Sequence, residues 1–172
     1  MKCDVGDVKG GPTIEPETST TKPIVVLGLG NPLMADEGIG VCLVVRLSRL
    51  ASERAEVEFV DAGTGGLAVL HRIRDRRKAI FIDCAYMGET PGTLRRFTPE
   101  QVCSRKVLAH QSLHEADLLR ILDMSRQLGQ MPDEVVIFGI QPERIEPSPD
   151  LSPSLTRRID EYLTVLLKEL NP

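Results

Sequence analysis

Short apolar runs alternate with longer amphipathic stretches along this chain from residue 23 onward. The apolar runs are mostly rich in β-branched or bulky residues and predict strands at 24–29, 57–61, 79–84, 94–97 and 135–140. The stretches between them repeat leucine and isoleucine at helical spacing. A chain that alternates strands with helices in this way is expected to form an α/β fold.

Three of the predicted strands contain four consecutive apolar residues: IVVL at 24–27, AIFI at 79–82 and VVIF at 135–138. Continuous apolar runs indicate strands that are covered on both faces, so the sequence predicts a three-layer α/β/α sandwich. Ser152 and Pro153 are expected to open the last helix as its cap and first residue. The predicted helix faces are Ile39, Leu43, Leu47 and Leu50; Leu67, Leu70 and Ile73; Leu118, Ile121, Leu122 and Leu128; and Leu155, Ile159, Leu163, Leu166 and Leu170.

Chain length and composition favour one domain over residues 23–172, because 172 residues with 41% hydrophobic content suffice for one sizeable core. Residues 1–22 are rich in Gly, Pro, Thr and acidic side chains and lack the apolar core of a signal peptide, so we expect a flexible tail. Because no segment approaches the roughly 18 to 20 apolar residues of a membrane span, we expect no membrane insertion. The four cysteines show no Cys-x-x-Cys spacing, which suits the reducing cytoplasm.

The charge of the chain argues against nucleic acid as a partner. The formal net charge is -4 and the pI is near 5.4, whereas a nucleic-acid surface needs a positive field. The densest basic run, at 72–78, is expected to be a solvated cap at a helix end, with no function assigned.

The stretch IVVLGLGNPLMADEGIG at 24–40 places an acidic pair where a phosphate-binding turn would have a glycine or a lysine. An acidic pair suits a cation instead of a phosphate. In an open parallel sheet, ligands bind where strands end and helices begin. Three groups of residues are candidates at that edge: Asp36 with Glu37, Asp83 at the end of the third strand, and His114 before the last strand.

His114 is selected by capping logic. Ser112 and Glu115 have the spacing of a capping box, which puts His114 in the first turn of a helix. The helix dipole disfavours a charged imidazole there, so a nitrogen lone pair stays available for a metal. The competing interpretation is a surface histidine near a helix cap. His110 lies in the loop before this turn as a possible secondary contact, and its spacing does not select it.

The carboxylates also have two interpretations each. Asp83 ends a buried strand, where a carboxylate needs a hydrogen bond or a cation, yet it could simply cap the next turn. Glu37 could serve as a helix N-terminal charge, and Asp61, before a glycine-rich turn, could be a cap. Taken together, two carboxylates and one imidazole predict an open site for a borderline divalent metal such as nickel or zinc.

At these residues the sequence resembles the hydrogenase maturation endopeptidases, which remove the C-terminal extension from the large subunit of nickel-iron hydrogenases. The resemblance covers roughly residues 24–170. The blocks that carry it, in order, are 28–40 (GLGNPLMADEGIG), 61–64 (DAGT), 82–83 (ID), 91–93 (PGT), 112–114 (SLH), 139–147 (GIQPERIEP) and 151–153 (LSP).

The resemblance implies that Glu37, Asp83 and His114 form a metal-binding trio. By the same resemblance, the metal is expected to be nickel that the hydrogenase precursor already carries, so the isolated chain is expected to hold no metal tightly. The resemblance also implies a five-stranded mixed, mostly parallel sheet of the phosphorylase/hydrolase-like kind, in which the strand at 94–97 runs antiparallel.

Two catalytic schemes are compatible with the resemblance. In one, the metal polarises the scissile carbonyl; in the other it only docks the precursor while Asp61 or Asp36 acts as general base. Gly63, Thr64 and His110 are the expected substrate contacts, and the expected enzyme is a cytoplasmic monomer. Covalent catalysis is disfavoured, because the sequence has no Gly-x-Ser-x-Gly elbow.

Two alternatives remain. A nickel carrier would bind the precursor without cutting it. A peptidyl-tRNA hydrolase would share the strand and the Gly-Leu-Gly-Asn-Pro opening, but Met34 to Glu37 stand where that class has a segment with its catalytic histidine. The negative net charge also opposes tRNA binding.

Overall fold

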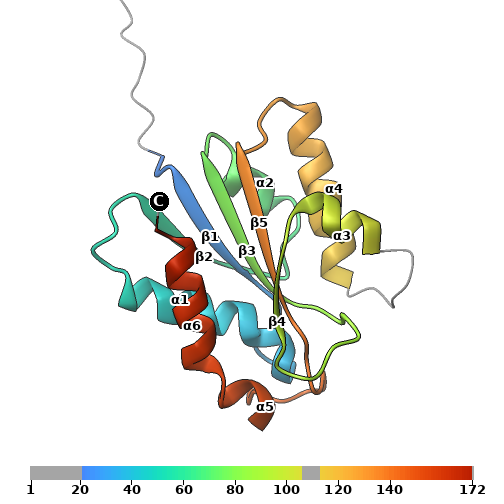
Figure 1. Cartoon of the computed structure of the whole chain (residues 1–172). Helices are drawn as coiled ribbons and strands as arrows, with labels where there is room; N and C mark the ends of the chain where they lie inside the picture. Colours follow the sequence, from blue (N-terminus) through green and yellow to red (C-terminus); the bar gives the residue numbers. More distant parts are fainter. Residues whose placement is uncertain (1–20, 106–112, 172) are drawn as a thin grey trace, which may run out of the picture.

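The computed structural model describes residues 21–105 and 113–171, and within these ranges the side chains outside residues 103–117. Five strands form one sheet in the order β2-β1-β3-β5-β4 (Figure 1). All neighbouring strands are parallel except β4, which runs antiparallel to β5. The expected mixed, mostly parallel sheet is therefore confirmed. The strands are β1 Ile24–Leu29, β2 Val57–Gly63, β3 Lys78–Cys84, β4 Leu94–Phe97 and β5 Glu134–Ile140.

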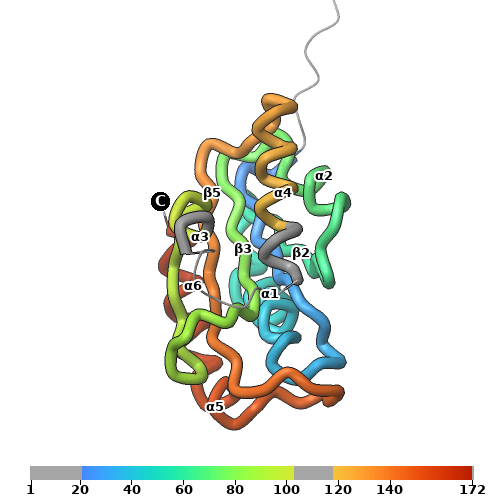
Figure 2. Tube along the Cα trace, turned by 90° about the vertical axis from the view of Figure 1, so that its right-hand side faces the viewer, coloured from blue at the N-terminus to red at the C-terminus, as the bar shows by residue number. Residues whose placement is uncertain are grey.

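Helices cover both faces of the sheet, as the two views in Figures 1 and 2 show. Helices α1 and α6 pack on one face and α2 and α4 on the other, so the three-layer sandwich is confirmed. The helices are α1 Ile39–Leu50, α2 Ala68–Ile73, α3 Pro99–Arg105, α4 Leu113–Gln127, α5 Pro153–Thr156 and α6 Ile159–Glu169, and a short 3-10 helix, η1 Ala35–Gly38, precedes α1.

The central strands are buried on both faces, as their continuous apolar runs predict. Side chains alternate across a strand, so Val26 of β1 packs against α1 and α6 while Val25 and Leu27 pack against α2 and α4. Tyr162, on α6, is the largest fully buried side chain in the described part of the chain. Two apolar cores therefore lie on opposite faces of one sheet.

Three leucines that the helical pattern assigned to buried faces are exposed. Leu50, Leu67 and Leu128 are 56%, 63% and 56% accessible. Leu50 is the last residue of α1, and the other two lie just outside α2 and α4. The pattern extends one residue beyond the helix at Leu67 and Leu128, whereas Leu50 belongs to α1 but lies at its exposed end.

The predicted last helix is divided. Helix α5 ends at Thr156, and α6 begins at Ile159 after Arg158 adopts φ -107 and ψ 5. Ser152 occupies the N-cap position of α5 and Pro153 is its first residue, as expected. Within the described residues, however, the side chain of Ser152 makes no capping bond. Its backbone N–H instead donates to the carboxylate of Asp36.

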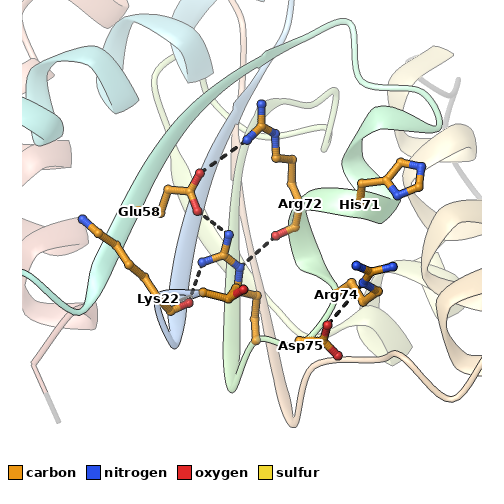
Figure 3. Close-up of a pocket in the computed structure, with 8 residues that line it drawn as sticks. Lys22, Glu58, His71, Arg72, Arg74 and Asp75 are labelled. Carbon is orange, nitrogen blue, oxygen red and sulfur yellow. Dashed lines mark hydrogen bonds and ion pairs between the residues drawn. The ribbon is translucent and has the colours of Figure 1, made fainter. Parts of the chain in front are cut away.

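The expectation that the basic run is solvated is wrong for two of its residues. Arg76 and Lys78 are buried. Arg76 lines a charged pocket at the amino edge of the sheet, where it ion-pairs with Glu58 and donates to the carbonyl oxygens of Lys22 and Arg72 at 2.5 and 3.0 Å. Figure 3 labels these three partners. Buried cations need such partners. Arg76 therefore joins the start of β1, β2 and the end of α2.

Among the described residues, no helix combines the length and the apolar character needed to cross a membrane.

Candidate active site

The turn from β1 into α1 is built on glycines because backbone segments touch there. A Cβ on Gly30 would lie 1.8 Å from the carbonyl oxygen of Glu37, and Gly30 itself has φ +118. A Cβ on Gly40 would lie 2.3 Å from the carbonyl oxygen of Ile82. Real Cβ atoms do not approach this closely, so only glycine fits at either position. These contacts hold Glu37 next to the carboxyl end of β3, where Asp83 follows Ile82.

Glu37 and Asp83 come from two elements that lie against each other, η1 and β3. Glu37 is partly buried within η1. Asp83 is 2% accessible, and its Oδ1 accepts the backbone N–H of Cys84 at 2.8 Å. The structure thus brings these two predicted carboxylates to the same edge of the sheet. Both are oxygen ligands of the kind that divalent cations bind.

His114 lies in the first turn of α4, which begins at Leu113. Leu118 of the same helix lines a small pocket together with Thr64, Gly65 and Gly66, the residues that follow β2. Ser112 and His110 fall outside the described residues, and the side chain of His114 is not among those described. In the part of the chain that is described, no three metal-binding side chains form a cluster.

Asp61 lies near the carboxyl end of β2, shortly before the turn at Thr64–Gly66. The Oδ1 of Asp61 accepts the N–H of Gly63 at 2.9 Å, and Gly63 has φ +51. The Gly63 carbonyl in turn accepts the N–H of Gly30 at 2.7 Å, which ties this turn to the one that carries Glu37. Asp61 and Thr64 are exposed at the carboxyl edge. Asp61 therefore does shape the turn, and its assignment as general base stays a prediction.

Asp36 lies in a different environment from its neighbour Glu37. Its side chain is completely buried. Oδ1 accepts the N–H of Ser152 at 2.7 Å, and Oδ2 accepts the N–H groups of Glu143 and Arg144 at 2.9 and 3.1 Å. A buried carboxylate held by three N–H groups is an anchor for the backbone around it. This geometry argues against Asp36 as the general base, because a base must reach a substrate proton.

Sequence reasoning missed the role of Gln141. This buried side chain accepts the N–H groups of Met87 and Glu89 at 2.7 and 3.2 Å through Oε1. It fixes the loop that follows Asp83. An amide in the first position after a buried strand was a usable signal, because a buried amide requires hydrogen-bond partners.

Tyr86 was also missed. It is 44% accessible on the loop directly after β3. Partial burial, together with the negative charges of Cys84 and Asp36, raises the pKa of Tyr86. A phenol is protonated at neutral pH, so Tyr86 can donate a hydrogen bond from the loop after β3.

Comparison with known proteins adds a second line of information. A family model described as hydrogenase maturation protease matches residues 41–169. The chain is 35% identical over 123 residues to the hydrogenase expression/formation protein HoxM of Cupriavidus necator, covering 72% of this chain and 61% of that protein. It is 34% identical over 151 residues to the hydrogenase 2 maturation protease of Escherichia coli, covering 86% of this chain and 90% of that one.

A solved structure agrees with these sequence matches. The hydrogenase maturating endopeptidase HybD from Escherichia coli superposes with a TM-score of 0.74 at 29% identity, over 86% of this chain and 91% of that one. The chain spans about three fifths of the length of the first two curated relatives, at 61% and 62%.

Proposed function

Because the chain belongs to the hydrogenase maturation protease family, we propose that it is an endopeptidase that removes the C-terminal extension of a nickel-iron hydrogenase large-subunit precursor. The observation that supports this proposal is the packing of η1, which carries Glu37, against β3, which carries Asp83 near its carboxyl end. Membership of the family leaves the peptidyl-tRNA hydrolase alternative without support.

Nickel is part of the substrate in this proposal. Glu37, Asp83 and His114 bind the nickel that the precursor already holds, so the enzyme cuts only after insertion of the metal. Two carboxylates and one imidazole suit a borderline divalent ion and leave coordination positions for the ligands of the precursor. Since the donor set lacks a thiolate, the isolated chain binds the free ion weakly.

Hydrolysis also requires a general base, and we assign this role to Asp61. Asp61 is exposed at the same edge, whereas Asp36 is enclosed by three backbone N–H groups. Asp61 takes a proton from the attacking water as the water oxygen bonds to the scissile carbonyl carbon. The carbon–nitrogen bond then breaks, and Asp61 gives the proton to the departing amine. Gly63 and Thr64, in the turn after Asp61, and His110 contact the substrate chain. Tyr86 is a further donor at this edge.

We further propose that the enzyme works as a monomer in the cytoplasm. Its cysteines have no disulfide-like spacing, and its substrate is a precursor that is still being assembled.

The test is cleavage of purified precursor with and without inserted nickel. The unmodified enzyme is expected to shorten only the nickel-loaded precursor. Asp83→Asn and His114→Ala should lower the cleavage rate at least ~100-fold while the far-UV circular dichroism and Tm stay close to those of the unmodified chain. Asp133→Asn, at an exposed carboxylate on the opposite edge, is the control and should cleave normally.

Equal cleavage of nickel-free and nickel-loaded precursor would contradict recognition through the metal. A nickel carrier, the remaining alternative, would bind the loaded precursor and leave its length unchanged.

A further inference from the structure

The buried carboxylate of Asp36 connects two segments that are far apart in sequence. Its partners Glu143, Arg144 and Ser152 lie 107, 108 and 116 residues later. All three donors are backbone N–H groups, and they come from the segment between β5 and α5. One side chain therefore fixes both ends of that segment, hereafter the 141–152 segment.

The backbone around Asp36 makes further bonds to the same segment. The N–H of Ala35 donates to the carbonyl of Ser148 at 2.7 Å, and the N–H of Ser148 donates to the carbonyl of Leu33 at 3.0 Å. Met34 and Ser148 form an isolated parallel bridge. The turn that contains Glu37 is thus paired with the 141–152 segment by main chain on both sides of residue 148.

The turn also stores backbone strain. Ala35 has φ +49, one of two positive values at non-glycine residues in the described part of the chain. Such a conformation is strained at alanine and persists where surrounding contacts determine it. Asp36 follows Ala35 directly, and its completely buried carboxylate with three N–H partners helps to hold this conformation, together with the bond from the Ala35 N–H to Ser148.

We propose that Asp36 is a positioning residue, whose carboxylate locks the turn onto the 141–152 segment and so sets the place of Glu37 at the site. Gln141, at the start of the same segment, fixes the loop after Asp83. The 141–152 segment therefore sets the relative position of the two carboxylates. The part of this inference that concerns nickel rests on the proposed function. The three hydrogen bonds to the Asp36 carboxylate, hereafter the lock, do not depend on it.

Asparagine is the informative replacement at position 36. It has nearly the shape of aspartate, but it offers one acceptor oxygen and turns an NH₂ group toward backbone N–H donors. Asp36→Asn therefore breaks the lock at one oxygen without leaving a cavity. Asp150→Asn, at an exposed carboxylate in the same segment, is the matched control.

The first readout is amide hydrogen exchange of the full-length chain by NMR. In the unmodified chain the amides of Glu143, Arg144 and Ser152 should exchange more slowly than those of exposed loop residues. In Asp36→Asn at least the amides facing the lost acceptor should exchange ~10-fold faster or more, with strand amides such as Val26 unchanged, while Asp150→Asn should match the unmodified chain.

The second readout is titration of the same proteins with Ni²⁺ alone. Residues that orient metal ligands typically change affinity ~10- to 100-fold, so Asp36→Asn should weaken Ni²⁺ binding by about this factor. In cleavage of nickel-loaded precursor, Asp36→Asn should raise KM more than it lowers kcat. It should also keep the shape of the pH profile, because the general base is still present.

Two results would overturn the inference. Rapid exchange of the Glu143, Arg144 and Ser152 amides in the unmodified chain would show that the lock does not form, and this measurement needs no variant. Unchanged exchange and Ni²⁺ affinity in Asp36→Asn, together with lost cleavage and an altered pH profile, would make Asp36 a catalytic group. If the unmodified enzyme cleaves no precursor, the proposed function is wrong. The exchange rates of the Glu143, Arg144 and Ser152 amides would still show whether the lock forms.

Discussion

Two glycines at the same edge of the sheet illustrate how differently a single residue can be constrained. Gly30 and Gly66 both have positive φ, +118 and +79. A Cβ at Gly30 would overlap the carbonyl of Glu37, whereas a Cβ at Gly66 would meet nothing within 4 Å. Both positions favour glycine because of their positive φ. Only Gly30 also lacks room for a Cβ, so the two effects can be measured separately.

We expect Gly30→Ala to destabilise the fold by more than Gly66→Ala. Gly66→Ala should cost about 1–2 kcal/mol for the left-handed backbone alone. Gly30→Ala must also displace the Glu37 backbone, and its total should exceed about 4 kcal/mol. Urea unfolding of both variants measures the difference, and equal losses would show that the turn yields easily.

For single residues, the sequence indicates which acidic residues lie at the carboxyl edge of the sheet, but it does not indicate which bonds each of them makes. Glu37 and Asp83 were predicted because each lies at a junction between a strand and a helix or loop. Asp36 was grouped with possible bases, since adjacent carboxylates look alike in a sequence. Its partners are backbone groups more than a hundred residues away, at 107, 108 and 116, which no local pattern reveals.

Among the elements, α6 is joined to the sheet by an ion network at its last turn. Lys78 at the start of β3 donates to Glu169 Oε1 at 2.7 Å, and Arg96 of β4 donates to Oε2 at 2.8 Å. The hydrogen bond from Arg96, with a smaller one from Lys78, lowers the pKa of Glu169 against the opposing effect of burial. The carboxylate is thus more acidic in the folded chain than in the unfolded chain.

This shift predicts an acid-dependent loss of stability. Since the folded pKa is depressed, Glu169 contributes its full stabilisation above the unfolded pKa of about 4.3 and loses it as the pH falls through the lower folded value. Glu169→Gln should cost about 2 kcal/mol at pH 7. The two proteins should therefore converge in stability as the pH falls from the unfolded pKa through the lower folded pKa of Glu169.

Urea unfolding of both proteins between pH 7 and pH 3 measures this effect. A stability difference that stays constant over the whole range would contradict it.

Arg76 makes a second connection between elements, at the amino edge of the sheet. Lysine would keep its charge but lacks the fork of donors that reaches Glu58, Lys22 and Arg72 together. We expect Arg76→Lys to destabilise the fold by about 2–3 kcal/mol. Arg74→Lys is the control, because Arg74 is exposed and pairs only with its neighbour Asp75 among the described contacts. Thermal unfolding that is identical in the two variants would contradict the role of Arg76.

The elements themselves could largely be predicted from the sequence. Strands β1 and β4 have the expected bounds and the other three differ by one or two residues, because apolar runs mark buried strands directly. The break between α5 and α6 could not be predicted, since no proline or glycine marks it. It allows both Arg158 and Tyr162 to donate to the carbonyl of Gly92 at 2.7 Å, a partner 66 and 70 residues away.

For the whole molecule, the strand order predicts a gradient of local stability. Strands β1, β3 and β5 each have a neighbour on both sides, whereas β2 and β4 form the edges. We expect amides of Val26, Ile80 and Val136 to exchange only by global unfolding, and the amides of β4 at least ~100-fold faster. Native-state hydrogen exchange by NMR tests this, and uniform protection across the five strands would refute it.

The lock around Asp36 also has a consequence for synthesis of the protein. Asp36 leaves the ribosome 116 residues before Ser152, the last of its three partners. Domains fold as they emerge, and contacts of long sequence separation close late. While translation continues, the Asp36 carboxylate stays hydrated and the strained turn at Ala35 has no lock to hold it. We therefore expect a nascent chain stalled before residue 152 to have a folded β1–β3 core with an unformed Glu37 turn, so that this turn takes its final position only after residue 152 has emerged.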